Sequence, residues 1–486
     1  MKTVFLFALI AIVNGCSYGQ SKIDQLDHLI STYAEYGKFN GSVLVAEKGK
    51  IIYKKGFGSA NVEWNIPNQP DTKHRLGSVT KQFTAMLIVQ LASENKLKLD
   101  VPVSAYLPDY PKKTGDIITI HHLLTHTSGI PDFTSFPGFG EMQRNPHHPE
   151  ELTRLFADSA LHFTPGQKFE YSNSGYVLLG YIIEKITSKT YEQVLQEKIF
   201  TPLNMNNSGV EHTGTVIKNK ASGYYRTGNT FQNANYVDMS VPFSAGAIYS
   251  TVEDMYLWDQ ALYTEKLLPK KYMALLFAKY ISTNYKQYYG YGWFIGEMSV
   301  GKTNDEIETN SHSGFINGFG TLITRIPSDR SSIVLLNNAG GAPLNEMTIA
   351  INGILYNKPY DFPKKSVAHS VSDVIEKEGI TAALSHYKEI KGSANYYLNE
   401  SEMNMAGYQL LQSGKAEEAA SVFKLTVEAF PNSFNAYDSY GEALLALGNK
   451  TGAIENYKKS VTLNPGNENG LKVLKTLGIN TDILIK

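Results

Sequence analysis

The sequence predicts an α+β domain that is followed by an all-α region at the C-terminal end. Strand–turn–strand patterns near residues 41–54 and 319–336 indicate antiparallel hairpins in the first part of the chain. Between them, apolar side chains surround much of the segment after residue 78, which is typical of a buried helix. From about residue 370 onward the pattern is helical and proline nearly vanishes.

Composition limits the classes of protein that this chain can represent. Its 486 residues are 42% apolar and 19% charged, which allows a large core and, at about 150 residues per domain, two or three domains. With 45 basic and 46 acidic residues, the chain has no global basic excess of the kind that indicates binding to nucleic acid. The single cysteine, Cys16, excludes an intramolecular disulfide framework, a cysteine-based zinc site and an iron–sulfur cluster.

Residues 1–20 have the pattern of a secretory signal. A basic start precedes the apolar run Val4–Val13, which is too short to span a bilayer of about 30 Å as a helix. Gly15 before Cys16 fits a bacterial lipoprotein processing site, although Asn14 is unusual there. Two alternatives follow: Cys16 is acylated and anchors the protein to a membrane, or cleavage nearby releases a soluble protein. Both alternatives place the mature chain outside the cytoplasm. It would lie in the periplasm, or it would be attached to a membrane through the lipid alone.

The rest of the chain divides into three predicted zones. Residues 22–356 mix strands and helices, and residues 357–368 contain two prolines and little apolar content, as a linker does. In residues 369–482, glycines, alanines, aromatic residues and prolines recur with a period of 34 residues, which is typical of tetratricopeptide repeats. Such repeats either bind a protein partner or form an appendage packed on the main domain.

Ser78 and Lys81 are the first candidate catalytic residues. Three residues apart, they share one face of a helix, and Ser78 stands at the helix start, where unpaired N–H groups favour an oxyanion. Lys81 would polarise Ser78, or act as its base if burial lowers the pKa of the ammonium. The Ser-x-x-Lys pattern occurs four times in the chain, but only Ser78 begins a buried helix.

Tyr171 and Asn173 form the second candidate group. They follow a Pro-Gly turn and precede an apolar helix predicted over Val177–Ile186. A phenol has a pKa near 10 and must be shifted down to serve as a base, which two nearby cations would do. The Asn173 amide is expected to hold an amide of the substrate.

The third candidate group is His312, Gly314 and Phe315, just before the predicted strand Phe319–Ile326. A strand edge here would pair with an extended substrate, and the Phe315 N–H would donate to an oxyanion. His312 is expected to tune the site or to bind a substrate carboxylate. Its imidazole predicts activity that is sensitive to pH near neutrality.

These pieces occur in the order of a known superfamily: Ser78-x-x-Lys81, His122–Gly129, Tyr171-x-Asn173, Ser250–Met255, and His312-x-Gly314. Together they resemble the serine β-lactamase and penicillin-binding protein superfamily, in the branch related to class C β-lactamases and DD-carboxypeptidases. The resemblance implies a central antiparallel sheet flanked by helices, with an all-helical subdomain inserted between the first and third groups.

The resemblance also implies a function. The chain would be a secreted or lipid-anchored serine hydrolase that forms an acyl-enzyme at Ser78 and cleaves amide or ester bonds, with DD-carboxypeptidase-like action on D-amino-acid peptides. His312 stands where β-lactamases often have the lysine of Lys-Thr-Gly, which favours peptidases and esterases. An esterase or a β-lactamase of the same superfamily is one alternative, and a repeat-mediated binding protein with a vestigial pocket is another. No metal or organic cofactor is expected.

Several other patterns are expected to carry no chemistry. Gly296–Thr303 matches a phosphate-binding loop, but too few apolar residues follow it to pack as a helix, so a connection between strands is expected. His122 and His126 could share a helical face as metal ligands, but they fall in the superfamily's structural loop. Lys-Thr-Gly occurs at Lys113–Gly115 and Lys450–Gly452, neither of which leads into a strand pair.

Overall fold

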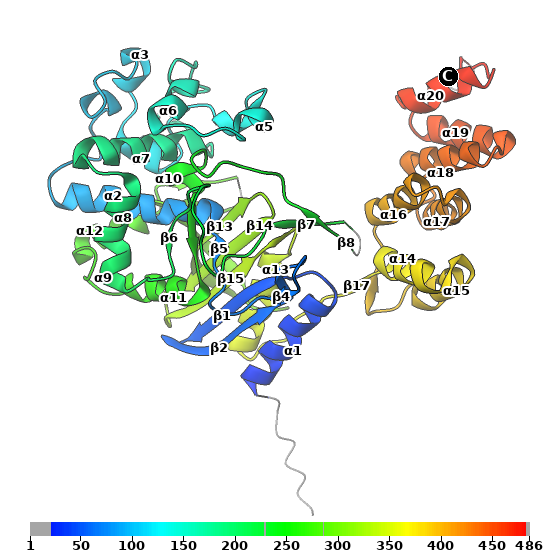
Figure 1. The fold of residues 1–486 in the computed structure, drawn as a ribbon, viewed down its shortest axis with the longest axis horizontal. Helices are drawn as coiled ribbons and strands as arrows, with labels where there is room; N and C mark the ends of the chain where they lie inside the picture. Colours follow the sequence, from blue (N-terminus) through cyan, green and yellow to red (C-terminus); the bar gives the residue numbers. More distant parts are fainter. Residues whose placement is uncertain (1–20, 228–229, 285, 483–486) are drawn as a thin grey trace, which may run out of the picture.

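The computed structural model describes residues 21–227, 230–284 and 286–482. The predicted signal and Cys16 lie outside these residues. Figure 1 shows an α+β body and a separate body of helices, which are joined by the segment that contains β17 (Lys365–Ser366).

The α+β body is built on an eight-stranded sheet with the strand order β10-β11-β12-β13-β14-β15-β1-β2. All neighbouring strands are antiparallel. Both predicted hairpins are confirmed, as β1–β2 and β14–β15, and β1 pairs with β15, so the two ends of the domain meet in the sheet. The strands are β1 (Gly41–Glu47), β2 (Lys50–Phe57), β10 (Ile281–Ser282), β11 (Tyr288–Tyr289), β12 (Phe294–Ser299), β13 (Glu306–Ile316), β14 (Phe319–Ile326) and β15 (Ser331–Asn337).

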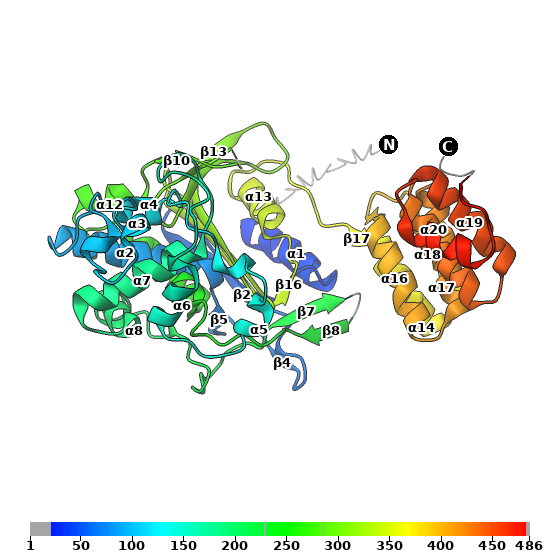
Figure 2. The ribbon, with the colours of Figure 1, turned by 90° about the horizontal axis from the view of Figure 1, so that it is seen from above.

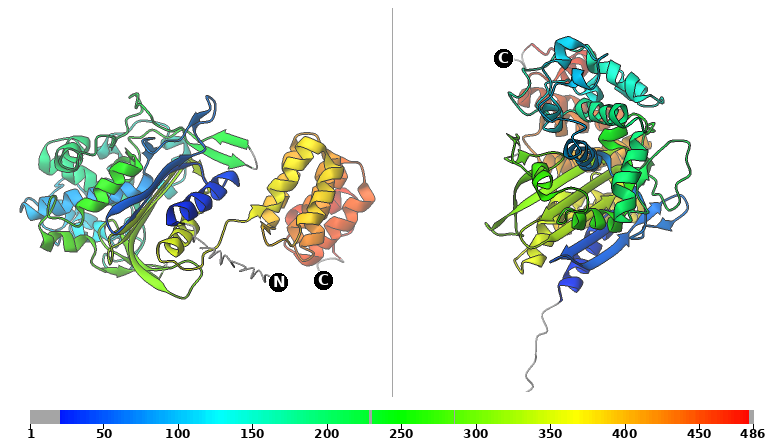
Figure 3. Two further views of the ribbon diagram at one scale, coloured as in Figure 1. Left: turned by 90° about the horizontal axis from the view of Figure 1, so that it is seen from below. Right: turned by 90° about the vertical axis from the view of Figure 1, so that its left-hand side faces the viewer.

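Helices cover both faces of this sheet, as Figures 2 and 3 show. Helices α1 (Lys22–Glu35) and α13 (Leu344–Leu355) pack on one face, where Val43 and Val45 of β1 point. The alternate residues Leu44 and Ala46 point to the other face, into the larger core. Successive side chains of a strand face opposite sides, so an apolar run such as β1 is buried on both.

Most of the helices lie between Ser78 and His312 in the sequence. Helix α2 (Thr80–Ser93) is buried along all residues from 80 to 92, as its apolar pattern predicts. The inserted region is not all-helical, however, because it also carries short strands, among which β9 (Ile248–Ser250) pairs with β5 (His74–Arg75) just before Ser78. The other inserted elements are α3 (Lys112–Gly115), α4 (Ile120–Leu124), α5 (Phe139–Met142), α6 (Pro149–Ala157), α7 (Asn173–Thr187), α8 (Tyr191–Leu195), α9 (Thr201–Leu203), α10 (Phe243–Gly246), α11 (Val252–Ala261), α12 (Lys270–Leu276), β6 (Gly209–Val210), β7 (Tyr224–Thr227) and β8 (Thr230–Asn233).

The C-terminal body is helical. Its first helix begins at Val367, inside the segment predicted as a linker, because the Ser366 hydroxyl caps it by accepting from the His369 N–H. In the described part of the chain, no helix combines the length and the apolar character needed to cross a membrane. The helices are α14 (Val367–Glu378), α15 (Ile380–Ile390), α16 (Glu400–Gln412), α17 (Ala416–Ala429), α18 (Phe434–Ala446), α19 (Lys450–Leu463) and α20 (Glu468–Thr476).

Candidate active site

Ser78 lies in a single 3-10 turn, η1 (Gly77–Val79), that runs directly into α2. The preceding Gly77 has φ +54°, in the left-handed region that favours glycine, and a Cβ there would lie 2.8 Å from the Phe315 nitrogen. The turn therefore packs directly on β13. This packing brings the backbone segments of Ser78 and Phe315 together, as an oxyanion hole made from these two N–H groups requires.

Lys81 is fully buried one helical turn from Ser78. Its Nζ is 3.0 Å from Ser78 Oγ, 2.8 Å from Asn173 Oδ1 and 3.0 Å from the Ala245 carbonyl oxygen. Burial lowers the Lys81 pKa to about 7, and the nearby Asp132 carboxylate opposes that shift. Near neutral pH, a large fraction of Lys81 is thus a neutral amine that can accept the Ser78 proton.

Tyr171 lies beside both Ser78 and Lys81. Its phenol group interacts with the Ser78 side chain, and the centroid of its ring is 4.9 Å from Lys81 Nζ. Burial raises the Tyr171 pKa well above its ordinary value, so the prediction that nearby cations lower it is wrong. Desolvation of the phenolate outweighs its favourable interaction with the Ser78 side chain, and the Asp132 carboxylate adds to the rise of the pKa. Tyr171 is therefore a neutral phenol that can pass on a proton, not a phenolate base.

Asn173 is the first residue of α7, which begins one turn earlier than predicted. Its Oδ1 accepts from Lys81, and its Nδ2 donates to Asp132 Oδ2 at 2.9 Å. The carboxylate thereby fixes which way the amide of Asn173 points. Sequence reasoning missed Asp132, although its place three residues after the run His122–Gly129 was a usable signal.

The third group is arranged along β13. Pairing between β12 and β13 ends at Ser311, so residues 312–316 pair with β14 on one edge only. The Ser78 turn packs over one face of the strand here: a Cβ at Gly314 would lie only 2.0 Å from the Leu76 carbonyl oxygen. The Phe315 side chain is 63% exposed, and it lines the cavity beside Ser78.

His312 is fully buried, and both of its ring nitrogens have partners. Nδ1 is 2.6 Å from the Ser313 carbonyl oxygen, and Nε2 is 3.0 Å from the hydroxyl of Tyr289, a residue that no sequence pattern indicated. Burial and then the Lys81 charge lower the His312 pKa to about 3. The imidazole is therefore neutral between pH 5.5 and 8, so it does not supply the pH sensitivity near neutrality that was predicted for it. Lys81, whose pKa is about 7, is the group of the site that titrates in this range.

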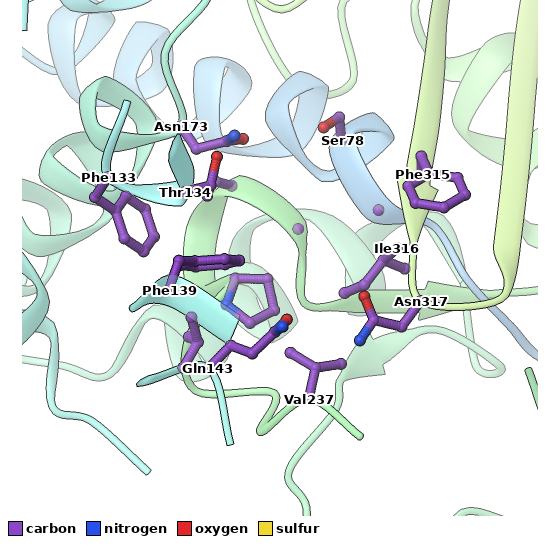
Figure 4. A pocket seen from close by; sticks show the side chains of 15 residues that line it. Ser78, Phe133, Thr134, Phe139, Gln143, Asn173, Val237, Phe315, Ile316 and Asn317 are labelled. Atoms are coloured by element: carbon purple, nitrogen blue, oxygen red, sulfur yellow. The ribbon is translucent and has the colours of Figure 1, made fainter. Parts of the chain in front are cut away.

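A cavity of about 350 Å³ opens beside Ser78 (Figure 4). Ser78, Asn173 and Phe315 lie along one side, and Phe139 and Val237 lie across from them (Figure 4). Among the residues that the structure describes, no acidic or basic side chain lines this cavity. Its lining residues are Gly77, Ser78, Phe133, Thr134, Phe139, Gln143, Asn173, Val237, Val241, Pro242, Ala245, Gly246, Phe315, Ile316 and Asn317.

The patterns that were set aside lie in structural positions. Gly296–Thr303 spans the end of β12 and the turn to β13, so a strand follows it, as expected. Lys113–Gly115 is part of α3, and Lys450–Gly452 begins α19. His122 Nδ1 accepts from the Thr119 N–H at the start of α4. Within the described ranges, no three His, Cys, Asp or Glu side chains are grouped as metal ligands would be.

The chain is similar to several known proteins. A penicillin-binding protein of Bacillus subtilis (strain 168) is 28% identical over 440 residues, which cover 85% of this chain and 91% of that protein. The crystal structure of a penicillin binding protein from Bacillus halodurans superimposes with a TM-score of 0.59 at 28% identity, over 67% of this chain and 100% of that one. A D-amino acid amidase from Ochrobactrum anthropi SV3 superimposes with a TM-score of 0.58 at 25% identity, over 68% and 99%. A model of the β-lactamase family matches residues 26–354, and the chain therefore belongs to this family of serine hydrolases.

Proposed function

We propose that the chain hydrolyses amide or ester bonds of small substrates through an acyl-enzyme at Ser78. The observation that carries the proposal is the 3.0 Å contact between Ser78 Oγ and a buried Lys81 amine whose pKa is about 7. A serine becomes a nucleophile when a positioned base takes its proton, and a base works best when its pKa is near the working pH.

The proposed acylation step assigns a place to each proton. Ser78 Oγ attacks the substrate carbonyl carbon while its proton moves to neutral Lys81. The oxyanion accepts from the N–H groups of Ser78 and Phe315. Ser78 lies at the start of α2, where the helix dipole also favours negative charge. When the bond to the leaving group breaks, Tyr171 protonates the departing nitrogen or oxygen and regains a proton from Lys81. Water, which loses a proton to neutral Lys81, then cleaves the ester to Ser78 and releases the acid.

The cavity supports a substrate with an apolar acyl side chain. Phe133, Phe139, Val237 and Ile316 supply most of its apolar wall, and Thr134 and Gln143 add neutral polar groups. A related structure is that of a D-amino acid amidase, so we infer that amides, esters and short peptides of apolar D-amino acids are the substrate class. With no cation on the wall and a neutral His312, a leaving group without charge fits better than one with a carboxylate.

A matched substrate panel tests the proposal. D-phenylalanine amide, its methyl ester, a D-phenylalanyl dipeptide with a free carboxylate and a penicillin are compared by kcat/KM, with Ser78→Ala as the control. The proposal expects turnover of the amide and the ester and weaker turnover of the dipeptide, all lost in the variant. Preferential turnover of the dipeptide would support a carboxypeptidase, and preferential turnover of the penicillin a β-lactamase. No turnover at all would favour the vestigial-pocket alternative.

For the C-terminal body, we infer tetratricopeptide-like repeats. Supporting contacts recur 34 residues apart: a Cβ at Gly407 would meet the Phe423 ring at 2.5 Å, and a Cβ at Gly441 would meet the Tyr457 ring at 2.9 Å. Close packing of a glycine on an aromatic ring between paired helices is thus repeated with the sequence period. Binding of a protein partner through residues 369–482 is the function that such repeats would supply.

We also propose that the chain acts outside the cytoplasm. The proposal rests on the signal-like residues 1–20, with Cys16 acylated or with cleavage nearby. Expression of the full chain in a bacterium, with metabolic labelling by a tagged fatty acid, tests the anchor against Cys16→Ser. A label that is lost in the variant supports the lipoprotein, and secretion without a label supports ordinary cleavage.

A further inference from the structure

Three side chains form a hydrogen-bonded row behind Tyr171. His126 follows α4, Tyr289 ends β11 and His312 lies on β13, and each is at most 1% exposed. The Tyr289 hydroxyl is 3.3 Å from His126 Nε2 and 3.0 Å from His312 Nε2. Because water does not reach these atoms, each donor and acceptor in the row must be satisfied by its protein neighbours.

The outer partners fix where the protons of the row lie. At one end, His126 Nδ1 accepts from the Ser172 N–H at 3.1 Å, so the proton of this imidazole is on Nε2 and points at the Tyr289 oxygen. At the other end, His312 Nδ1 faces the Ser313 carbonyl oxygen, which can only accept. The proton of His312 is therefore on Nδ1, and its Nε2 needs a donor.

Tyr289 is the residue that completes the row. Its hydroxyl accepts from His126 Nε2–H and donates to His312 Nε2, so every polar atom in the row is paired. The neighbouring Tyr176 hydroxyl donates to the Leu124 carbonyl oxygen. If Tyr289 donated to Tyr176 instead, His312 Nε2 would be buried without a donor, which is unfavourable because the lost hydrogen bond to water is not replaced.

The row also holds the ring of Tyr171. The rings of His126 and Tyr171 lie 4.2 Å apart between centroids with an interplanar angle of 31°, and the His312 ring is 6.3 Å from Tyr171. We propose that Tyr289 is a positioning residue that locks His126 and His312 in opposite neutral tautomers and thereby keeps Tyr171 against Ser78. The kinetic part of this inference rests on the proposed function, and the part on tautomers does not.

The tautomers are tested by nitrogen-15 spectra of the full chain labelled at histidine, in which protonated and unprotonated ring nitrogens have separate shifts. His126→Gln and His312→Gln assign the signals. At pH 7, the proposal expects a proton on Nε2 of His126 and on Nδ1 of His312. Tyr289→Phe should change the His312 signals toward a mixture of forms, because Nε2 has lost its donor. A charged His312, or a proton on its Nε2 in the unmodified protein, would overturn the proposal, whether or not the variant folds.

The positioning role is tested by kinetics with a matched variant. Tyr289 does not line the cavity, so Tyr289→Phe should leave KM within about twofold and lower kcat, by up to about a hundredfold if Tyr171 shifts by 1 Å. Tyr53→Phe is the control, because this buried tyrosine lies on β2, outside the site, and donates to Asp27 on α1. A Tyr289→Phe protein that folds with unchanged kcat and unchanged histidine signals would refute the role. If no substrate is turned over, the spectra still decide the tautomers while the proposed function fails.

Discussion

The fit of β13 against the Ser78 turn makes Gly314→Ala the most informative single substitution. The added Cβ would lie 2.0 Å from the Leu76 carbonyl oxygen and 2.5 Å from Thr321 Oγ1. The first contact is with backbone, so it cannot be relieved by a side-chain rotation. The strand and the turn must move apart by about 1 Å, which separates the two N–H groups assigned to the oxyanion.

The expected loss follows from that displacement. A 1 Å misplacement of catalytic groups costs about a hundredfold in rate, and loss of one oxyanion donor costs about a hundred- to a thousandfold. Gly314→Ala is therefore expected to lower kcat/KM for a D-phenylalanine ester by about two to three orders of magnitude. Overpacking should cost only about 1–3 kcal/mol of stability, so the fold should persist.

Gly320→Ala is the matched control on the neighbouring strand. A Cβ at Gly320 has no heavy-atom neighbour nearer than 3.9 Å, so the same chemical change should leave kcat/KM within a few-fold. A second variant, Thr321→Val, removes the hydrogen bond from Oγ1 to the Leu76 carbonyl oxygen without adding bulk and should cause a smaller loss. Gly314→Ala activity within threefold of the unmodified protein, with the fold intact by circular dichroism, would show that the fit of β13 against the Ser78 turn does not position the oxyanion donors.

Three further predictions concern charge and packing. Since the neutral form of Lys81 takes the Ser78 proton, kcat/KM should fall as pH drops below about 7. Asp132→Asn removes the charge that raises the Lys81 pKa, so it should move the inflection of this pH profile to lower pH, and an inflection that stays in place would contradict this. Asp259→Ala leaves the buried Arg325 guanidinium without its carboxylate, so the free energy of unfolding, measured in urea, should fall by about 3–5 kcal/mol. A change below about 1 kcal/mol would show that this ion pair is not needed for stability. Gly441→Val should destabilise the helical body by about 1–3 kcal/mol in thermal melts and leave kcat/KM unchanged; a lost hydrolase activity would mean that the two bodies are coupled.

Local patterns predicted much of the fold. The buried helix after Ser78 and the hairpin β14–β15 followed from side-chain periodicity, because burial on a helix or strand repeats with the geometry of that element. The boundary of α14 differed by two residues, since the hydroxyl of Ser366 supplies a cap inside the predicted linker. The short strands of the inserted region were not predicted, because two to four residues are too few to show the alternation of apolar and polar side chains.

Sequence patterns predicted which residues form the site, but they did not predict the pKa shifts of these residues. Ser78, Lys81 and Asn173 do meet, at the distances given above, but the raised pKa of Tyr171 and the neutrality of His312 depend on burial that only the folded chain reveals. Tyr289 comes from a two-residue strand and has no sequence signal of its own. Its role depends entirely on contacts with residues far away in the sequence.

Whether Ser78 is a nucleophile is best decided by intact-mass measurement after incubation with a fluorophosphonate and, separately, with a penicillin. We expect one fluorophosphonate adduct per chain on the unmodified protein and none on Ser78→Ala. A penicillin adduct in addition would indicate that the site also accepts β-lactams. No adduct with either probe on folded protein, or an adduct that persists in Ser78→Ala, would show that Ser78 is not the nucleophile.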